Sequence, residues 1–158
     1  MSIQLLNFTK LDVTQKEIIL SWRNHSDVRQ WMLHHDAISM DEHLSFIESL
    51  KNRSDKRYFL VQRDEEYLGV IDFTAITEDS AEFGIYGNPS VYGVGKILMV
   101  TLIDYAFTAL RVSKLIANVF SDNEKAKHLY ATFDFKETSH TLYRNREIIT
   151  MELQHDDR

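Results

Sequence analysis

The sequence predicts a single α/β domain over residues 1–158, with a mixed, mostly antiparallel sheet of about seven strands and about four helices on its faces. Three observations support this fold class. The chain has 158 residues, 44% of them apolar, which suits one domain with a sizeable core. Segments with helical spacing of apolar residues interrupt short strand-like segments. One strand–helix–strand unit in the second half implies a right-handed crossover and locally parallel strands.

The first half of the chain combines one strand with helices. Residues 3–8 alternate weakly between apolar and polar side chains, which predicts a strand. Helical spacing predicts helices at residues 14–24 and 41–52, with a short turn at residues 26–31 between them. Thr14 followed by Glu17 fits a capping box for the first helix, and Asp41 is placed to stabilise the N-terminus of the second.

The rest of the chain alternates between strands and helices. Strand patterns cover residues 57–63, 67–74, 80–86, 114–120, 135–141 and 147–153. The first three of these strands follow one another closely, which predicts an antiparallel meander. Helical spacing covers residues 96–110 and 123–133. The loop before the first of these two helices holds Pro89, the one proline of the chain.

Composition and charge exclude several classes of protein. The chain has 18 Lys and Arg against 24 Asp and Glu without a basic stripe, which argues against a nucleic-acid-binding protein. It has no cysteine, so disulfides and thiolate metal sites are excluded, and no histidine run, residues 34–36 included, has a spacing that indicates a metal. The first ten residues show neither a signal peptide nor a membrane span, so we expect a cytoplasmic enzyme or binding module.

Two glycines stand directly before the helix predicted at residues 96–110, in the stretch VYGVGKILM. Gly93 and Gly95 lack a Cβ, so an anion can approach the backbone N–H groups at the positive end of this helix. The same spacing is equally compatible with a tight turn that binds nothing. Leu98 stands where a dinucleotide fingerprint needs its third glycine, and Ile97 stands where a Walker loop needs Ser or Thr, so both of these loops are excluded.

A third phosphate loop fits better. NPSVYGVGKILMVTLIDYAF resembles the acetyl-CoA pyrophosphate loop of the GNAT N-acetyltransferases, and SDNEKAKHLYATFDF resembles their later signature. That signature falls here on Asn123, Ala126, Leu129, Tyr130 and Phe135. The resemblance implies the GNAT fold, whose element order matches the one predicted above. Ser90 replaces the usual Arg or Gln in a slightly shortened loop, and Asp134 replaces the usual glycine before Phe135.

A closer resemblance runs through most of the chain. WRNHSDVRQWM, EHLSFIESL, RYFLVQRDEEYLGVIDF and FGIYGNPSVYGVGKILM are similar to the acetyltransferases of bacterial pseudaminic acid synthesis, which serves flagellin glycosylation. These enzymes acetylate the 4-amino group of UDP-4-amino-4,6-dideoxy-N-acetyl-β-L-altrosamine. The resemblance implies acetyl-CoA as co-substrate, a nucleotide-sugar substrate and no metal. Two alternatives stay open: another amine acceptor (a protein N-terminus, a polyamine or an aminoacyl nucleotide), or a non-catalytic acetyl-CoA-binding module.

The resemblance also assigns the parts of the cofactor site. The pyrophosphate is expected on the backbone N–H groups of Gly93, Val94, Gly95 and Lys96. Main-chain groups near Phe83 and Ile85 are expected to pair with pantetheine, which adds like a strand beside residues 80–86. Asn123 matches a position that contacts the cofactor, and it fits a helix N-cap equally well.

Tyr130 matches the family tyrosine that donates a proton to the CoA sulfur. A phenol with an ordinary pKa of about 10 is protonated at neutral pH and can donate. Without the resemblance, Tyr130 reads as a core aromatic. No base is assigned: Glu82 is placed either to act through water or to face solvent as an ordinary strand residue, and a water chain would also serve.

The substrate residues follow from the resemblance alone. Arg23 and His43 are expected on the face that meets the nucleotide diphosphate, with Thr74 and Tyr86 near the same site. The alternatives are an Arg23 that pairs with a local carboxylate and a His43 that is an ordinary surface residue. Apolar residues near the C-terminal strands are compatible with a homodimer.

Overall fold

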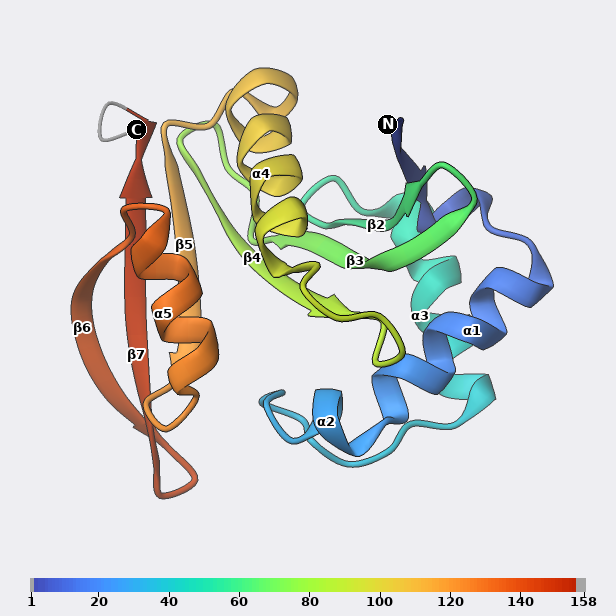
Figure 1. The fold of residues 1–158 in the computed structure, drawn as a ribbon, viewed down its shortest axis with the longest axis horizontal. Helices are drawn as coiled ribbons and strands as arrows, with labels where there is room; N and C mark the ends of the chain where they lie inside the picture. Colours follow the sequence, from blue (N-terminus) through green and yellow to red (C-terminus); the bar gives the residue numbers. More distant parts are fainter. Residues whose placement is uncertain (1, 156–158) are drawn as a thin grey trace.

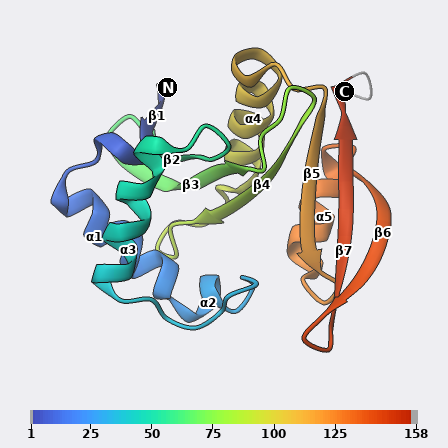
Figure 2. The ribbon, with the colours of Figure 1, turned by 180° about the vertical axis from the view of Figure 1, so that it is seen from behind.

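A computed structural model describes residues 2–155 of the chain, which form one continuous sheet with helices on both faces (Figures 1 and 2). The seven strands lie in the order β1-β2-β3-β4-β5-β7-β6. All neighbouring pairs are antiparallel except β4 and β5. The mixed, mostly antiparallel sheet expected from the sequence is confirmed.

The first four strands form an antiparallel array. They are β1 (Ile3–Asn7), β2 (Arg57–Arg63), β3 (Glu66–Thr74) and β4 (Ser80–Gly87). The last three are joined by short turns, so the predicted meander is confirmed. The register pairs Tyr58 with Asp72, and Asp72 with Gly84. Because paired residues of neighbouring strands share a face, these three residues form one row across the sheet.

The second half of the sheet separates from the first after a short parallel contact. The strands are β5 (Lys114–Phe120), β6 (Lys136–Tyr143) and β7 (Arg146–Gln154). β4 pairs with β5 only from Ser80 to Phe83, whereas β7 pairs with β5 along the whole strand to Phe120. Beyond Phe83, β4 and β5 therefore diverge, and Figure 1 shows this splay in the middle of the molecule.

The N-terminal helices pack against one face of the sheet, on which Leu60 and Val70 are buried. They are α1 (Val13–Asn24), the short α2 (Ser26–Arg29) and α3 (Met40–Ser49). The capping box of α1 is formed by Asp12 and Gln15 rather than by the predicted Thr14 and Glu17. The extended backbone at Asp12 lets its carboxylate accept the Gln15 N–H at 2.8 Å, so the helix starts earlier than expected.

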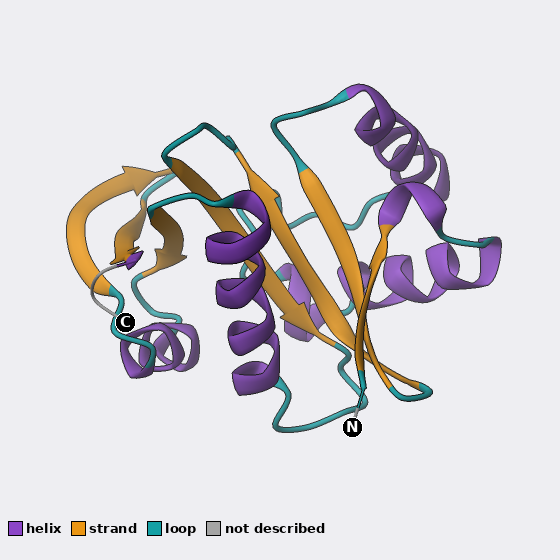
Figure 3. Ribbon diagram, turned by 90° about the horizontal axis from the view of Figure 1, so that it is seen from above, coloured by secondary structure: helices purple, strands orange, loops and turns teal. Residues whose placement is uncertain are grey.

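The other two long helices pack on the opposite face, as the view from above also shows (Figure 3). They are α4 (Gly95–Tyr105), which continues as a π-helical turn η3 (Ala106–Leu110), and α5 (Glu124–Thr132). Short 3-10 turns occupy η1 (Phe8–Lys10) and η2 (Leu50–Asn52). The count of about four helices becomes five because the turn expected at residues 26–31 closes into α2.

The start of α3 agrees with the expected dipole argument. Ser39 caps it through a capping box with Glu42, and Asp41 lies in the first turn. None of the helices within residues 2–155 combines the length and the apolar character that a membrane span requires.

Candidate active site

The N-terminus of α4 presents free backbone donors. Its first intrahelical bond runs from the Leu98 N–H to the Val94 carbonyl at 3.0 Å, so the amides of residues 95–97 have no partner within the helix. No side chain of the described chain caps them. Gly93 has a φ of +74°, with open space where a Cβ would lie. This arrangement has the geometry of an anion site, and the exposed Lys96 adds positive charge beside it.

Gly95 has a second reason to lack a side chain. A Cβ there would lie 3.2 Å from Leu129 Cδ2, so the start of α4 packs closely against α5. The loop before it is held by Asn88, whose N–H donates to the Leu68 carbonyl and whose side-chain oxygen accepts the Ser90 N–H. Ser90, which replaces the usual Arg or Gln, is thus part of a fixed turn.

The edge of β4 leads from this loop into the splay. Pairing with β5 ends at Phe83, so the main chain at Ile85 has left its neighbour on that side. The Phe83 side chain points to the face of the sheet that α4 and α5 cover. There its ring packs edge-on against the Tyr130 ring, with 5.3 Å between the two centroids. The main-chain edge at Ile85 is open to a ligand that adds like a strand, whereas Phe83 still pairs with Ala117, and the expected contact of pantetheine with this edge stays a prediction.

Tyr130 lies on α5, opposite this edge, and is buried against Phe83 and Phe135. Burial, followed by the negative charge of Asp72, raises the pKa of the Tyr130 phenol above its usual value. Tyr130 is therefore protonated at neutral pH, as a proton donor must be. Asn123 caps the same helix by accepting the Ala126 N–H at 3.2 Å, which confirms its N-cap alternative. Its contact with the cofactor stays a prediction.

Arg23 and Arg29 form a half-buried cationic pair at the junction of α1 and α2. The Nη2 of Arg23 donates to the His34 carbonyl at 2.6 Å, and the Nη1 of Arg29 to the His35 carbonyl at 3.3 Å. The buried Arg23 Nη1 and Arg29 Nε have no hydrogen-bond partner. Within residues 2–155 neither arginine forms an ion pair, so the local carboxylate considered for Arg23 is not found.

The electrostatics around Arg23 also favour an anionic partner. Its pKa is lowered chiefly by burial, with an opposing contribution from Tyr86 and a smaller lowering by Arg29. Two half-buried guanidinium groups, each with an unpaired buried nitrogen, represent uncompensated charge, which a doubly charged anion would satisfy. The sequence alone does not indicate a role for Arg29. Its position six residues after Arg23 is the one signal in the sequence that links the two arginines.

His43 has a different place from the one expected. Its side chain is buried between α1 and α3, where Nε2 lies 2.9 Å from the Lys16 carbonyl. Burial is the main cause that lowers the pKa of His43, so the ring is neutral at neutral pH. The residue joins two helices, and neither a substrate contact nor the alternative of a surface residue agrees with this burial.

Thr74 and Tyr86 do lie on the same sheet face as the row at Asp72. Thr74 is two residues beyond Asp72 on β3, and Tyr86 is two residues beyond Gly84 on β4. Glu82 pairs with Thr74, and its carboxylate accepts a hydrogen bond from Asn118 Nδ2 at 2.7 Å. The same amide accepts from the Thr150 hydroxyl, so Glu82 is the first member of a fixed polar chain over three strands.

Asp72 is the site residue that sequence reasoning missed. It stands within the apolar strand segment GVIDF, between the buried Ile71 and Phe73. Burial raises the pKa of its carboxyl to about 7, against smaller lowering effects of the Gly84 backbone N–H and of Lys56. The sequence does hold one signal for Asp72, because an acidic residue is unusual inside an apolar strand. Its position beside the site follows only from the register of β3 with β4.

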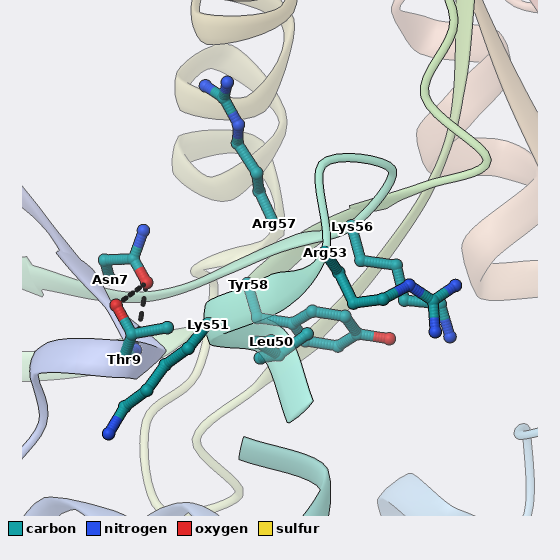
Figure 4. A pocket seen from close by; sticks show the side chains of 8 residues that line it. All are labelled: Asn7, Thr9, Leu50, Lys51, Arg53, Lys56, Arg57 and Tyr58. Carbon is teal, nitrogen blue, oxygen red and sulfur yellow. Dashed lines mark hydrogen bonds between the residues drawn. The ribbon is translucent and has the colours of Figure 1, made fainter. Parts of the chain in front are cut away.

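A separate hollow of about 280 Å³ lies near the start of β2 (Figure 4). It is lined by Asn7, Thr9, Leu50, Lys51, Arg53, Lys56, Arg57 and Tyr58. Two of its cations are engaged elsewhere: Arg53 pairs with Asp55, and Arg57 points toward α4 and donates to the Tyr105 hydroxyl. Residues 2–155 contain no cluster of His, Asp or Glu that could hold a metal ion.

Similarity to known proteins agrees with this geometry. The family model described as an acetyltransferase (GNAT) domain matches residues 5–136. The acetyltransferase PseH of Campylobacter jejuni is 50% identical over 128 residues, which cover 81% of each chain. The crystal structure of Campylobacter jejuni N-acetyltransferase PseH in complex with acetyl coenzyme A has a TM-score of 0.81 at 38% identity, over 97% of this chain and 99% of that one.

A more distant likeness extends to another N-acetyltransferase. Spermidine N-acetyltransferase from Vibrio cholerae, solved with CoA and spermine, has a TM-score of 0.87 at 23% identity over 98% of this chain and 96% of that one, which shows the shared fold. The matches confirm the expected acetyl-CoA-dependent N-acetyltransferase and the resemblance to the pseudaminic acid enzymes. The chain belongs to the GNAT acetyltransferase family.

Proposed function

We propose that the protein transfers the acetyl group of acetyl-CoA to the 4-amino group of UDP-4-amino-4,6-dideoxy-N-acetyl-β-L-altrosamine in pseudaminic acid synthesis. The observation that carries this proposal is the pair of half-buried arginines, Arg23 and Arg29, whose unpaired donors suit a diphosphate. The similarity to acetyltransferase PseH supports the same acceptor.

Different residues of the chain bind different parts of the cofactor. The amides of Gly93, Val94, Gly95 and Lys96 hold the pyrophosphate at the N-terminus of α4. The β4 edge near Phe83 and Ile85 aligns pantetheine along the splay, and Asn123 at the start of α5 contacts the same molecule. The thioester is thereby directed to the buried Tyr130.

The reaction at this site is an acyl transfer from sulfur to nitrogen. The acceptor amine attacks the thioester carbonyl, the new C–N bond forms, and the C–S bond breaks. The Tyr130 hydroxyl gives its proton to the departing sulfur, which leaves as a thiol. Holding the two reactants in line provides much of the rate enhancement, because the step becomes effectively unimolecular.

The acceptor binds on the sheet face covered by α1 and α2. Arg23 and Arg29 receive the diphosphate, and Tyr86 and Thr74 line the path from there to the splay. His43 has no direct role in this assignment, because it is buried in the α1–α3 contact.

A polyamine acceptor is the second candidate, favoured by the likeness to spermidine N-acetyltransferases. Two uncompensated arginines repel a polycation, so the charge at the site favours the nucleotide sugar. The retained Tyr130 argues against a non-catalytic acetyl-CoA-binding module.

A thiol-release assay separates these functions. The acceptors are the UDP-linked 4-amino sugar, its 4-hydroxy counterpart as matched control, and spermidine. We expect thiol release with the 4-amino sugar alone. Release with spermidine but not with the sugar would replace the proposal by its alternative, and acetyl-CoA binding without release for any amine would indicate a binding module.

Cellular location and assembly are further proposals. We place the enzyme in the cytoplasm, where its nucleotide-sugar and acetyl-CoA substrates are found. It acts on a small molecule and not on nucleic acid or membrane.

A homodimer stays a prediction, and light scattering is the measurement that tests it directly. All eight residues of the edge strand β6 are exposed, which leaves this edge accessible to a second copy.

A further inference from the structure

Asp72 is an ionisable side chain in the middle of the sheet that the acid step at Tyr130 does not use. It lies on β3, on the face that carries Thr74 and Tyr86, at the level where β4 separates from β5. Gly84, its partner on β4, is the first residue of β4 beyond the contact with β5. The row of Tyr58, Asp72 and Gly84 therefore leads directly to the splay.

Gly84 determines where the Asp72 carboxylate can lie. A Cβ on Gly84 would be 2.8 Å from Oδ2 and 3.2 Å from Oδ1 of Asp72, so the carboxylate occupies the space that any other residue's side chain would fill. The Gly84 backbone N–H stabilises its charged form. The carboxylate is thus directed across β4 toward the open edge rather than along β3.

The groups that face Asp72 come from two strands, a loop and a helix. They are Tyr58 on β2, Lys56 just before it, Tyr86 on β4, and Tyr130 on α5, and each interacts electrostatically with the carboxyl. Lys56 provides the one positive charge among these four, and its effect is smaller than that of burial. The phenols keep their protons, because burial raises the pKa of each.

We propose that the Asp72 carboxylate is the base that takes a proton from the ammonium form of the acceptor. The carboxylate removes one proton from R–NH₃⁺, and the free amine attacks the thioester carbonyl. The C–N bond forms, the C–S bond breaks, and Tyr130 gives its proton to the sulfur. The second amine proton returns to the Tyr130 oxygen, and Asp72 releases its proton to water. The sum is R–NH₃⁺ plus acetyl-CoA to amide, free thiol and H⁺.

The two groups assist each other in this sequence. The negative charge of Asp72 raises the pKa of Tyr130, so the phenol is a better acid once Asp72 has been neutralised by the acceptor's proton. A carboxyl with a pKa of about 7 is well matched to accept a proton from an amine near neutral pH. Glu82 on the same face lies where β4 still pairs with β5, and its carboxylate is engaged by the Asn118 amide.

The test compares Asp72→Asn with Glu82→Gln and wild type in the thiol-release assay with the UDP-linked 4-amino sugar, from pH 6 to pH 9. This inference rests on the proposed function. We expect Asp72→Asn to lose about 100-fold in kcat/KM at pH 7. The loss should shrink toward pH 9, where the amine loses its proton without help. Glu82→Gln should match wild type, and acetyl-CoA affinity, measured by calorimetry, should be equal in all three.

Each outcome decides the question. An Asp72→Asn enzyme with wild-type rate and pH profile overturns the inference while the proposed function stands. An equal loss at every pH also overturns it, because a merely structural role would not follow the protonation of the amine. A wild type that releases no thiol with the sugar removes the proposed function and the inference together. Should Asp72→Asn fail to fold, carbon-13 NMR of the wild-type Asp72 carboxyl decides: titration near neutral pH supports the inference, and titration near pH 4 contradicts it.

Discussion

The carboxylate of Asp72 lies over the backbone of Gly84, so close that a Cβ on Gly84 would come within 2.8 Å of Oδ2. The two residues are register partners on β3 and β4. This contact places a carboxylate beside the point where β4 separates from β5, where we propose that the thioester of acetyl-CoA binds.

Replacing Gly84 by Ala tests this placement without removing the carboxylate. The new methyl group forces Asp72 away from the splay, so we expect kcat/KM to fall about 10- to 100-fold, comparable to loss of a positioned base. Acetyl-CoA affinity should change much less. Full activity in Gly84→Ala would show that the position of the carboxylate does not matter.

The raised pKa of Asp72 predicts how stability depends on pH. The folded chain holds this proton up to about pH 7, whereas an unfolded Asp loses it near pH 4. Between these values the folded state binds more protons, so the free energy of unfolding falls as pH rises, by at most about 4 kcal/mol. Urea titrations of wild type and Asp72→Asn, with Glu82→Gln as control, measure the difference. A wild type and an Asp72→Asn variant with parallel pH dependence would contradict the assigned pKa.

Tyr130→Phe removes the proposed proton donor and keeps the ring that packs against Phe83. We expect about a 100-fold loss in kcat with unchanged acetyl-CoA affinity, because only the transition state uses the hydroxyl. Tyr105→Phe is the matched control, since its hydroxyl accepts from Arg57 outside the site. Equal rates for the two variants would remove Tyr130 as the acid.

Arg23→Gln tests the diphosphate contact. Loss of a charged hydrogen bond of about 1.5–3 kcal/mol should raise the KM for the nucleotide sugar about 10- to 100-fold, while the KM for acetyl-CoA stays the same. Arg53→Gln is the control, because that guanidinium pairs with the exposed Asp55. If the KM for acetyl-CoA rises instead, Arg23 belongs to the cofactor site.

Replacing Asp134 by Gly is expected to increase the stability of the folded chain. It has a φ of +73°, the left-handed region that glycine adopts without strain, and it follows α5 directly. Asp134→Gly should raise the free energy of unfolding by about 1 kcal/mol and leave kcat unchanged. A lower midpoint in thermal unfolding would show that the Asp side chain contributes more than the strain costs.

The fold and the site differ in how far the sequence predicts them. Apolar periodicity predicts the meander and the crossover, because each depends on local spacing. The sequence predicts the capping box of α1 two residues too late, because Asp12 with Gln15 and Thr14 with Glu17 both fit the capping-box pattern. Asp72 was missed because its role depends on a register that joins β3 to a glycine on β4.

The arginine pair and His43 show the same limit. Whether a helical arginine meets a carboxylate, a carbonyl or a ligand depends on the loop at residues 34–38, which no periodicity describes. His43 is buried because its ring meets a carbonyl of another helix, 27 positions earlier in the chain. Local patterns predict elements, and contacts between distant elements decide which polar residues reach the site.

A crystal structure with acetyl-CoA and the 4-hydroxy analogue of the UDP sugar tests the central claim most directly. We expect the pyrophosphate on the amides of residues 93–96, the sulfur within about 3.5 Å of the Tyr130 hydroxyl, and the sugar diphosphate on Arg23 and Arg29. A structure in which the α4 N-terminus is empty, or in which the Tyr130 hydroxyl faces away from the sulfur, would contradict it.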